Sequence, residues 1–321
     1  MGKLYRATMD RPNGDMTTLT LPADADGIAR AVALLLAGEV VAVPSETVYG
    51  LAARASDPAA VAKVFEAKGR PSFNPLIVHV ADAVQAAKLV HIGPVAERLI
   101  ERFWPGALTL VLPFRLGARL APQVRAGLPT VAIRCPAHPV MQAVIAGAGP
   151  LAAPSANASG GLSPTRAAHV AASLGGRIPL ILDAGPCMAG VESTIVAVDG
   201  DRISLLRPGA IDAARLGINA AAGPGIAAPG QLASHYAPDQ PVRLDARTAT
   251  LSEYHIGFGA VRGDITLSAA GDVDEAAARL FDLLHLAQAS GRAGIAVAPI
   301  PERGLGVAIN DRLRRAAAAR H

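Results

Sequence analysis

Short β-type runs alternate with helix-forming segments between residues 24 and 208, and this alternation limits the folds open to the chain. The helical segments repeat apolar residues every three to four positions, and the runs between them are short and mostly apolar. The predicted helices cover residues 24–37, 58–68, 82–90, 94–103, 138–147 and 165–175. The predicted strands cover residues 39–43, 76–80, 107–114, 130–135, 150–156, 179–185, 193–199 and 202–208. This interleaving predicts an α/β fold in which helices cover a sheet.

Two local signals delimit elements of this fold. Asp57 is suited to the N-cap of a helix, Pro58 to its first position and Gly69 to its end. Residues 198–201 read Val-Asp-Gly-Asp between two β-type runs, which is typical of a tight hairpin turn. Because a hairpin joins antiparallel strands, the sheet is predicted to be mixed rather than purely parallel.

The composition changes after residue 217. Residues 218–241 are dense in Gly, Pro and Ala and show little periodicity, so we predict an interdomain linker there. The linker separates a first domain, residues 1–217, from a second, residues 242–321. Two domains are also expected because the 321 residues exceed what one core usually holds.

The second domain is predicted to be a smaller α/β unit of the Rossmann-like kind. Its β-type runs are 242–246, 254–261 and 294–300, and its helices begin near Asp272 and about Asn310. Residues 312–320, which are basic and rich in alanine, are predicted to be a solvated helix end.

Composition also narrows the class of protein. Hydrophobic residues make up 51% and charged residues 17% of the chain, which excludes wholesale disorder. Cys135 and Cys187 have no metal-ligand spacing, so a reducing compartment is the simplest expectation. The sequence shows neither a signal-peptide pattern nor an apolar run of membrane-spanning length. We therefore expect a cytoplasmic protein with no membrane partner.

A basic loop joins a predicted helix to a predicted strand in VFEAKGRPSFNPLIVHV, residues 64–80. Arg70 offers a planar fork for a phosphate or carboxylate, and Lys68 offers a mobile point charge. Asn74 is suited either to contact a nucleotide or to brace the loop. A single histidine inside a strand, such as His79, is more often a satisfied core residue than a ligand.

Hydroxyl groups gather where another predicted strand ends. Ser45, Thr47 and Tyr49 follow the run 39–43, and ligands of open α/β sheets bind at the carboxyl ends of strands. Ordinary turn chemistry explains the same residues equally well.

Further candidates lie in the second half of the first domain. Arg134 sits on an otherwise apolar strand, and a buried arginine needs an anion, from the protein or from a ligand. PSANASGG, residues 154–161, is a small-residue loop whose amides could approach a phosphate, but it lacks the lysine and spacing of a P-loop. Ser193 opens one strand of the hairpin and Arg207 closes the other, so the two can lie side by side. Motifs for a serine nucleophile or a zinc hydrolase are absent from the sequence.

In order along the chain, these stretches resemble the YrdC-like threonylcarbamoyl-AMP synthases. The matching stretches are PSETVYGLAA, KGRPSFNPLIVHV, FWPGALTLVL, TVAIRCP, PSANASGG, ESTIV and LLRPG. The later HYAP and AINDRLRRAA resemble the longer members, which carry an extra C-terminal domain. The resemblance implies a YrdC-like fold, a mixed twisted sheet with helices and a concave ligand cavity.

The resemblance also implies a reaction and its partners. L-threonine, bicarbonate or carbon dioxide, and ATP would give L-threonylcarbamoyl-adenylate and pyrophosphate, with Mg²⁺ bound to ATP. The product would pass to a transferase complex that modifies the adenosine beside the anticodon of tRNAs reading codons that start with A. Direct binding of tRNA is a further, less supported expectation.

The family's functional positions fall on particular residues here. For L-threonine they are Thr47, His79, Arg134, Ala153 and Ser193. For ATP they are Lys68, Arg70, Asn74, Thr130, Ser155, Ser163, Arg207 and Tyr236. By resemblance, Lys68 and Arg70 would be catalytic and Tyr236 would fold back over the nucleotide.

Two other functions compete with this interpretation. An RNA-binding module without adenylation activity would use the basic concave surface, but the chain has few aromatics to stack on bases. A carbamoyl-phosphate-dependent transferase of the hydrogenase-maturation type would need further modules, and the chain has neither the length nor the cysteines for them.

Overall fold

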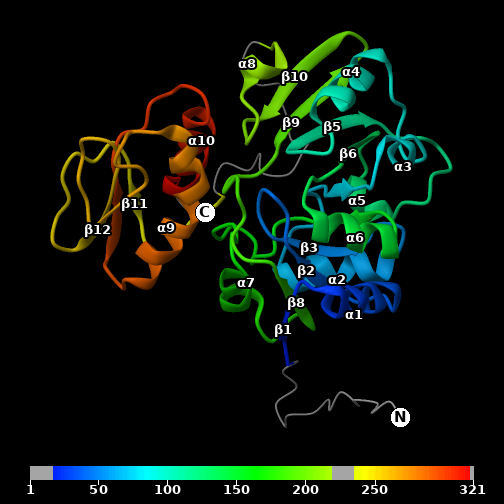
Figure 1. Ribbon diagram of the computed structural model, residues 1–321, viewed down its shortest axis with the longest axis horizontal. Coiled ribbons are helices and arrows are strands. Elements are labelled where there is room, and N and C mark those ends of the chain that lie inside the picture. The colour runs from blue at the N-terminus through cyan, green and yellow to red at the C-terminus, as the bar shows by residue number, and fades with distance from the viewer. Residues whose placement is uncertain (1–16, 219–234, 319–321) are drawn as a thin grey trace.

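The computed structural model describes residues 17–218 and 235–318, which form two sheets accompanied by helices (Figure 1). A ten-stranded mixed sheet lies in residues 19–207 and a four-stranded sheet in residues 242–297. The α/β prediction is confirmed for both parts. The predicted linker, residues 218–241, falls largely outside the described residues. None of the described helices combines the length and apolar character needed to cross a membrane.

The large sheet combines parallel and antiparallel neighbours, as the hairpin signal predicted. Its spatial order is β1 (Leu19–Pro22), β8 (Leu180–Asp183), β2 (Val41–Val43), β3 (Gly50–Arg54), β7 (Leu151–Ala152), β4 (Ile77–His79), β6 (Thr130–Arg134), β5 (Leu108–Pro113), β9 (Thr194–Asp199) and β10 (Arg202–Arg207). β9 and β10 form the predicted antiparallel hairpin, whereas β4 and β6 are parallel. The sequence analysis missed β1 and β3. The β signal of β3 is weak because this strand follows the hydroxyl-rich turn directly and consists mainly of small residues.

Helices cover much of this sheet. They are α1 (Ala25–Leu36), α2 (Pro58–Lys68), α3 (Ala83–Ala87), α4 (Pro94–Phe103), α5 (Pro122–Arg125), α6 (Pro139–Ala148), α7 (Ala167–Leu174) and α8 (Ala213–Leu216). α1 and α6 share one apolar core, and α2 and α4 contribute to a second core. α2 begins and ends as predicted: the Asp57 side chain accepts hydrogen bonds from two backbone amides, and Gly69 takes the left-handed conformation.

Strand register places polar side chains in one row across the sheet. His79 on β4 pairs with Arg134 on β6, and Arg134 pairs with Thr109 on β5. Because successive side chains of a strand face opposite sides, Val78 and Ile133 point into the core while this row points away from it. The row forms the floor of the candidate site described below.

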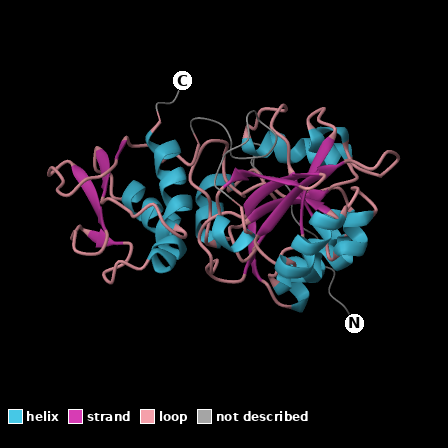
Figure 2. Cartoon of the chain, turned by 90° about the horizontal axis from the view of Figure 1, so that it is seen from above, coloured by secondary structure: helices cyan, strands magenta, loops and turns pink. Residues whose placement is uncertain are grey.

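The C-terminal part is a small parallel α/β unit. Its strands lie in the order β11 (Val242–Arg243), β14 (Gly294–Val297), β12 (Glu253–Gly257) and β13 (Ile265–Thr266), with helices α9 (Val273–Ala289) and α10 (Gly306–Ala317). Asp272 is the N-cap of α9, as predicted, but α10 begins before the predicted Asn310. In Figures 1 and 2, both helices lie between the small sheet and the large domain.

The two parts pack closely. Val48 and Val191 of the large domain belong to the same apolar cluster as Leu280 and Phe281 of α9. Gly190 has a φ of +67°, and a Cβ there would come within 2.3 Å of the Ala277 carbonyl oxygen. Only glycine fits this close approach without moving the backbone of α9.

A cluster of four ionisable side chains joins α7 to α9. Arg166 forms two hydrogen bonds to the Asp282 carboxylate, at 2.6 and 3.0 Å. The rings of His169 and His285 are stacked with their centroids 3.8 Å apart, and His169 Nε2 lies 3.5 Å from Asp282 Oδ1. The two histidines are therefore held in contact across the boundary between the two parts.

This cluster predicts that acid destabilises the protein. Burial, and then His285, lower the pKa of His169 to about 4, and burial also lowers the pKa of His285. Because unfolding raises both pKa values toward about 6.5, the stability they contribute is fully present above about pH 6.5 and is lost as the pH falls toward about 4. We expect His169→Gln to flatten the decline of the thermal midpoint between about pH 7 and about pH 5. The exposed His91→Gln should leave that slope unchanged, and an unaltered slope in His169→Gln would contradict the assignment.

Candidate active site

A pocket opens on the row of polar side chains, with an empty volume of about 580 Å³ that includes space open to solvent. Nine of the residues predicted to bind substrates line it: Thr47, Arg70, His79, Arg134, Ala153, Ser155, Ser193, Arg207 and Tyr236. Four others, Lys68, Asn74, Thr130 and Ser163, are not part of its wall. The pocket brings together segments of the large domain and, at His235 and Tyr236, the C-terminal end of the predicted linker.

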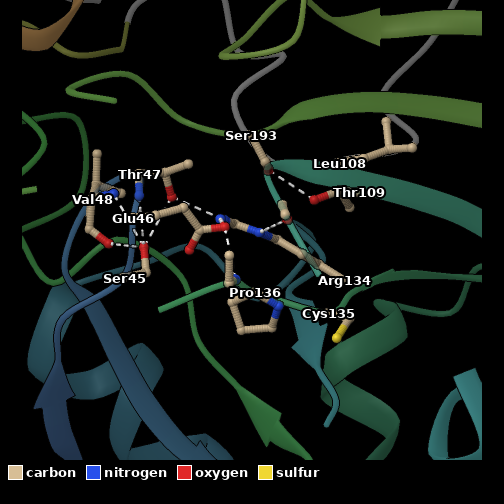
Figure 3. Close-up of polar contacts among 12 residues, drawn as sticks. Ser45, Glu46, Thr47, Val48, Leu108, Thr109, Arg134, Cys135, Pro136 and Ser193 are labelled. Atoms are coloured by element: carbon tan, nitrogen blue, oxygen red, sulfur yellow. Dashed lines mark hydrogen bonds and ion pairs between the residues drawn. The ribbon is translucent and has the colours of Figure 1, made fainter. Parts of the chain in front are cut away.

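One side of the pocket centres on Arg134 at the end of β6 (Figure 3). Its Nε donates to the Gly106 carbonyl at 3.1 Å and its Nη1 to Thr47 Oγ1 at 2.9 Å. Nη2 forms an ion pair with Glu46 Oε1 at 2.6 Å. A guanidinium has five N–H groups and these three contacts use three of them, so the buried Arg134 can still bind a carboxylate ligand.

His79 and Ser193 border Arg134. Burial, and then the charge of Arg134, lower the pKa of His79 to about 3, so the ring is neutral at physiological pH. Its Nδ1 is buried and has no hydrogen-bond partner among the described residues. Ser193 Oγ lies 2.8 Å from Thr109 Oγ1 and accepts from Arg207 Nη2 at 3.2 Å. These neutral polar groups could orient the hydroxyl or amine of a small ligand.

The other side of the pocket carries two arginines. Among the described residues, Arg70 donates to the backbone carbonyls of Asn74, at 3.4 Å, and Pro75, at 3.0 Å. Burial lowers its pKa to about 10, so it remains charged at neutral pH. Arg207 donates to the Ser193 carbonyl at 2.9 Å, which confirms that the two strand ends lie side by side. Two buried guanidiniums in the wall make the pocket attractive to polyanions.

Lys68 lies behind the pocket rather than in its wall. Its buried ammonium donates to the carbonyls of Ser155, at 2.6 Å, and Asn157. Burial, and then the charge of Arg70, lower the pKa of Lys68 well below its ordinary value. In this structure Lys68 braces the small-residue loop 154–161, and its predicted catalytic role stays a prediction.

The remaining predicted positions also lie outside the wall. Asn74 is buried beside Arg70, and its Oδ1 has no hydrogen-bond partner among the described residues. Thr130 begins β6 and lies four residues before Arg134, so the two residues are about 13 Å apart along the strand. Ser163 is buried and donates to the Glu192 carboxylate. Their predicted contacts with ATP stay predictions.

Glu192, which the sequence analysis missed, is an acidic residue in the pocket wall and is paired with the C-terminal part. Arg312 Nε on α10 donates to Glu192 Oε2 at 2.7 Å, and the Arg312 side chain is fully buried. The prediction that residues 312–320 form a solvated helix end is therefore wrong for Arg312, because a partner on the large domain compensates its burial. Burial would raise the pKa of Glu192, but Arg312 and Arg207 lower it overall.

Tyr236 and His235 cover the pocket. Both are buried, and Tyr236 has a φ of 60°, a strained value for a residue with a side chain. The Arg312 guanidinium lies 5.1 Å from the Tyr236 ring centroid, and the His235 ring meets the Tyr236 ring edge-on at 4.1 Å. A strained backbone at a pocket wall is typical of functional segments.

Ser45, one of the hydroxyl residues predicted at the end of the run 39–43, also lines the wall. The other wall residues were not singled out as binding positions: they are Val48, Gly50, Ile77, Met141, Pro154, Glu192 and His235. Strand alternation could have identified Ile77, which lies two residues before His79 on the same face. Glu192 and Met141 carried no comparable signal, because their place in the wall depends on packing between distant segments.

Comparison with known proteins agrees with this architecture. Residues 33–209 match the Sua5/YciO/YrdC family model, described as "Telomere recombination", and residues 210–318 match the model "Threonylcarbamoyl-AMP synthase, C-terminal domain". A threonylcarbamoyl-AMP synthase of Bacillus subtilis is 44% identical over 91% of this chain and 93% of its own length. One of Pyrococcus abyssi is 38% identical, with 88% and 92% covered.

A solved structure matches both parts of the chain. It is the crystal structure of P. abyssi Sua5 complexed with L-threonine, with a TM-score of 0.81 and 36% identity. The match covers 94% of this chain and 97% of that one. The chain therefore belongs to the Sua5/YciO/YrdC family, in the long form that carries the C-terminal domain of the threonylcarbamoyl-AMP synthases.

Proposed function

We propose that this protein is an L-threonylcarbamoyladenylate synthase, a nucleotidyltransferase that uses L-threonine, bicarbonate or carbon dioxide, and ATP. The observation that carries the proposal is a single pocket lined by three buried arginines. Arg134 has N–H groups left for a carboxylate, and Arg70 and Arg207 line the same pocket. The full-length similarity to threonylcarbamoyl-AMP synthases supports the same activity.

The chemistry requires positioning rather than a protein nucleophile. Threonine's amine attacks carbon dioxide, loses a proton and forms an N-carboxylate. An oxygen of that carboxylate then bonds to the α-phosphorus of ATP, and the bond from this phosphorus to the β-phosphate oxygen breaks to release pyrophosphate. Arg134 would hold the amino acid's own carboxylate, and Arg70 and Arg207 would stabilise the triphosphate.

Mg²⁺ would enter as the ATP complex. Among the described residues, no three His, Cys, Asp or Glu side chains gather into a cluster able to hold a metal ion. Mg²⁺ prefers phosphate and water oxygens over an all-protein cage, so the wall described above suits an ion carried by ATP. Bound there, it would neutralise charge on the phosphates.

The N-carboxylate and the mixed anhydride both need protection from water. Tyr236 and His235 already lie over the pocket, and we infer that they belong to a lid that closes on both substrates. The product would pass to a tRNA-modifying transferase complex, since an acyl-adenylate is an activated donor for an amine. Direct binding of tRNA stays a prediction, and no observation favours an RNA-binding module without adenylation activity.

Product analysis tests the function directly. The purified protein, incubated with L-threonine, bicarbonate and Mg-ATP, should release pyrophosphate and form a threonine-dependent adenylate detectable by mass spectrometry. Omitting bicarbonate or threonine should abolish the adenylate. Hydrolysis of ATP to ADP without an adenylate would contradict the proposal.

Threonine should be preferred over serine. Ala153, Ile77 and Met141 give the pocket an apolar surface on which the threonine methyl can pack. One buried methyl contributes about 1 kcal/mol, so kcat/KM should differ by about tenfold at most. Competition between the two amino acids at limiting concentration measures the ratio, and equal turnover would contradict this pocket.

A further inference from the structure

Glu46 lies beside the pocket without lining it. Its neighbours Ser45 and Thr47 both line the wall, whereas the Glu46 side chain lies against the Arg134 guanidinium (Figure 3). Glu46 Oε1 accepts a hydrogen bond from the Ala137 amide at 3.0 Å, and its backbone carbonyl accepts one from Ala189. Two separate segments of the chain thus fix its backbone and its carboxylate.

The contacts of Arg134 leave its guanidinium little freedom. The Gly106 carbonyl and the Thr47 hydroxyl accept from Nε and Nη1, and Glu46 Oε1 lies 2.6 Å from Nη2. Because the guanidinium is planar, three contacts at three nitrogens fix its plane and its direction. The three contacts use three of its five N–H groups, and the other two remain for a ligand.

Charge balance gives Glu46 a second effect. Arg70, Arg134 and Arg207 all line one pocket, and Glu192 in the same wall is already paired with Arg312. Burial would raise the pKa of Glu46, but Arg134 and the Ala137 amide lower it overall, so its carboxylate is ionised at neutral pH. This carboxylate compensates the charge of the buried Arg134, which would otherwise be an unpaired buried cation.

We propose that Glu46 is a positioning residue for the amino-acid carboxylate: it fixes Arg134 in the orientation from which the guanidinium binds threonine. The proposal rests on the synthase function and deepens it. The alternative is that Glu46 acts on the ligand through space alone, in which case its negative charge would weaken binding of the threonine carboxylate. Under that alternative, removal of the charge would strengthen threonine binding.

Calorimetric titration of L-threonine into the full-length protein tests this without requiring turnover. Glu46→Gln keeps the shape of the side chain but removes its charge, and we expect threonine to bind about tenfold more weakly. The affinity for Mg-ATP should stay within about twofold. Glu39→Gln is the matched control: this acid pairs with Lys63 away from the pocket and should change neither affinity.

Two further variants guard against a general folding defect. Glu46→Asp keeps the charge but shortens its reach, and we expect an intermediate loss of threonine affinity with ATP binding unchanged. In an Arg134→Ala background, Glu46→Gln should lower kcat/KM for threonine by less than about twofold, because the partner through which it acts is gone.

Unchanged or tighter threonine binding by Glu46→Gln would overturn the proposal, as would equal losses for threonine and ATP or additive losses with Arg134→Ala. A wild-type protein that binds threonine but forms no adenylate would instead overturn the synthase function, and the comparison of affinities would still decide the role of Glu46.

Discussion

Replacing Arg70 by alanine is expected to lower kcat/KM for ATP by about a thousandfold. Arg70 is a buried cation of the pocket wall, and its hydrogen bonds to the described residues go to the backbone carbonyls of Asn74 and Pro75, so its charge is available to a triphosphate. An arginine that stabilises a phosphoryl transition state contributes on the order of 10³-fold or more. Initial rates of pyrophosphate release at varied ATP and saturating threonine measure the effect.

Arg134→Ala should give the opposite pattern. It should raise the KM for threonine strongly while changing the KM for ATP by less than about threefold, because Arg134 is assigned to the amino acid and Arg70 to the triphosphate. Arg98→Ala is the control, since this arginine is exposed on α4. The two-sided pocket would be wrong if Arg70→Ala and Arg134→Ala altered both substrates' kinetics alike.

Replacing Arg312 by alanine is expected to destabilise the protein by about 3–5 kcal/mol and to abolish most synthesis. The substitution would leave the Glu192 carboxylate buried without its strongest partner, and breaking one side of a buried ion pair costs about that much. An uncompensated negative charge would also repel ATP from the wall. Tyr236 would lose the guanidinium that packs on its ring.

A second substitution separates these effects from a packing defect. Glu192→Gln combined with Arg312→Met removes both charges, and its thermal midpoint should lie closer to that of the wild type than the midpoint of Arg312→Ala. Arg314→Ala, on the exposed side of the same helix, is the matched control and should change neither stability nor activity. If Arg312→Ala behaved like Arg314→Ala, the pair would be irrelevant to the ATP side.

This prediction gives the C-terminal domain a physical role. Within residues 235–318, only the adjoining His235 and Tyr236 line the pocket wall, yet the domain places Arg312 against Glu192. A chain cut after about residue 212 would expose the apolar cluster shared by Val48 and Leu280 as well as the Glu192 carboxylate. Truncation should therefore resemble Arg312→Ala in its loss of synthesis.

Much of the fold could be predicted because its signals are local. The cap at Asp57, the glycine end at Gly69 and the hairpin at 198–201 each depend on a few adjacent residues, and all three are confirmed. The candidate residues could be named because the motifs that carry them are continuous stretches. The short strand β3 was missed because its small residues carry a weak β signal.

The order of elements, the mixed sheet and most of the polar residues of the pocket could thus be predicted from the sequence. The burial of Arg312 on Glu192, 120 positions away, and the place of Lys68 behind the wall depend instead on tertiary packing. The reason is physical: caps and turns are set by neighbouring residues, whereas burial and charge pairing depend on which distant segments meet. A basic helix end is predicted to be solvated, because the sequence does not show that a buried carboxylate on another domain compensates its charge.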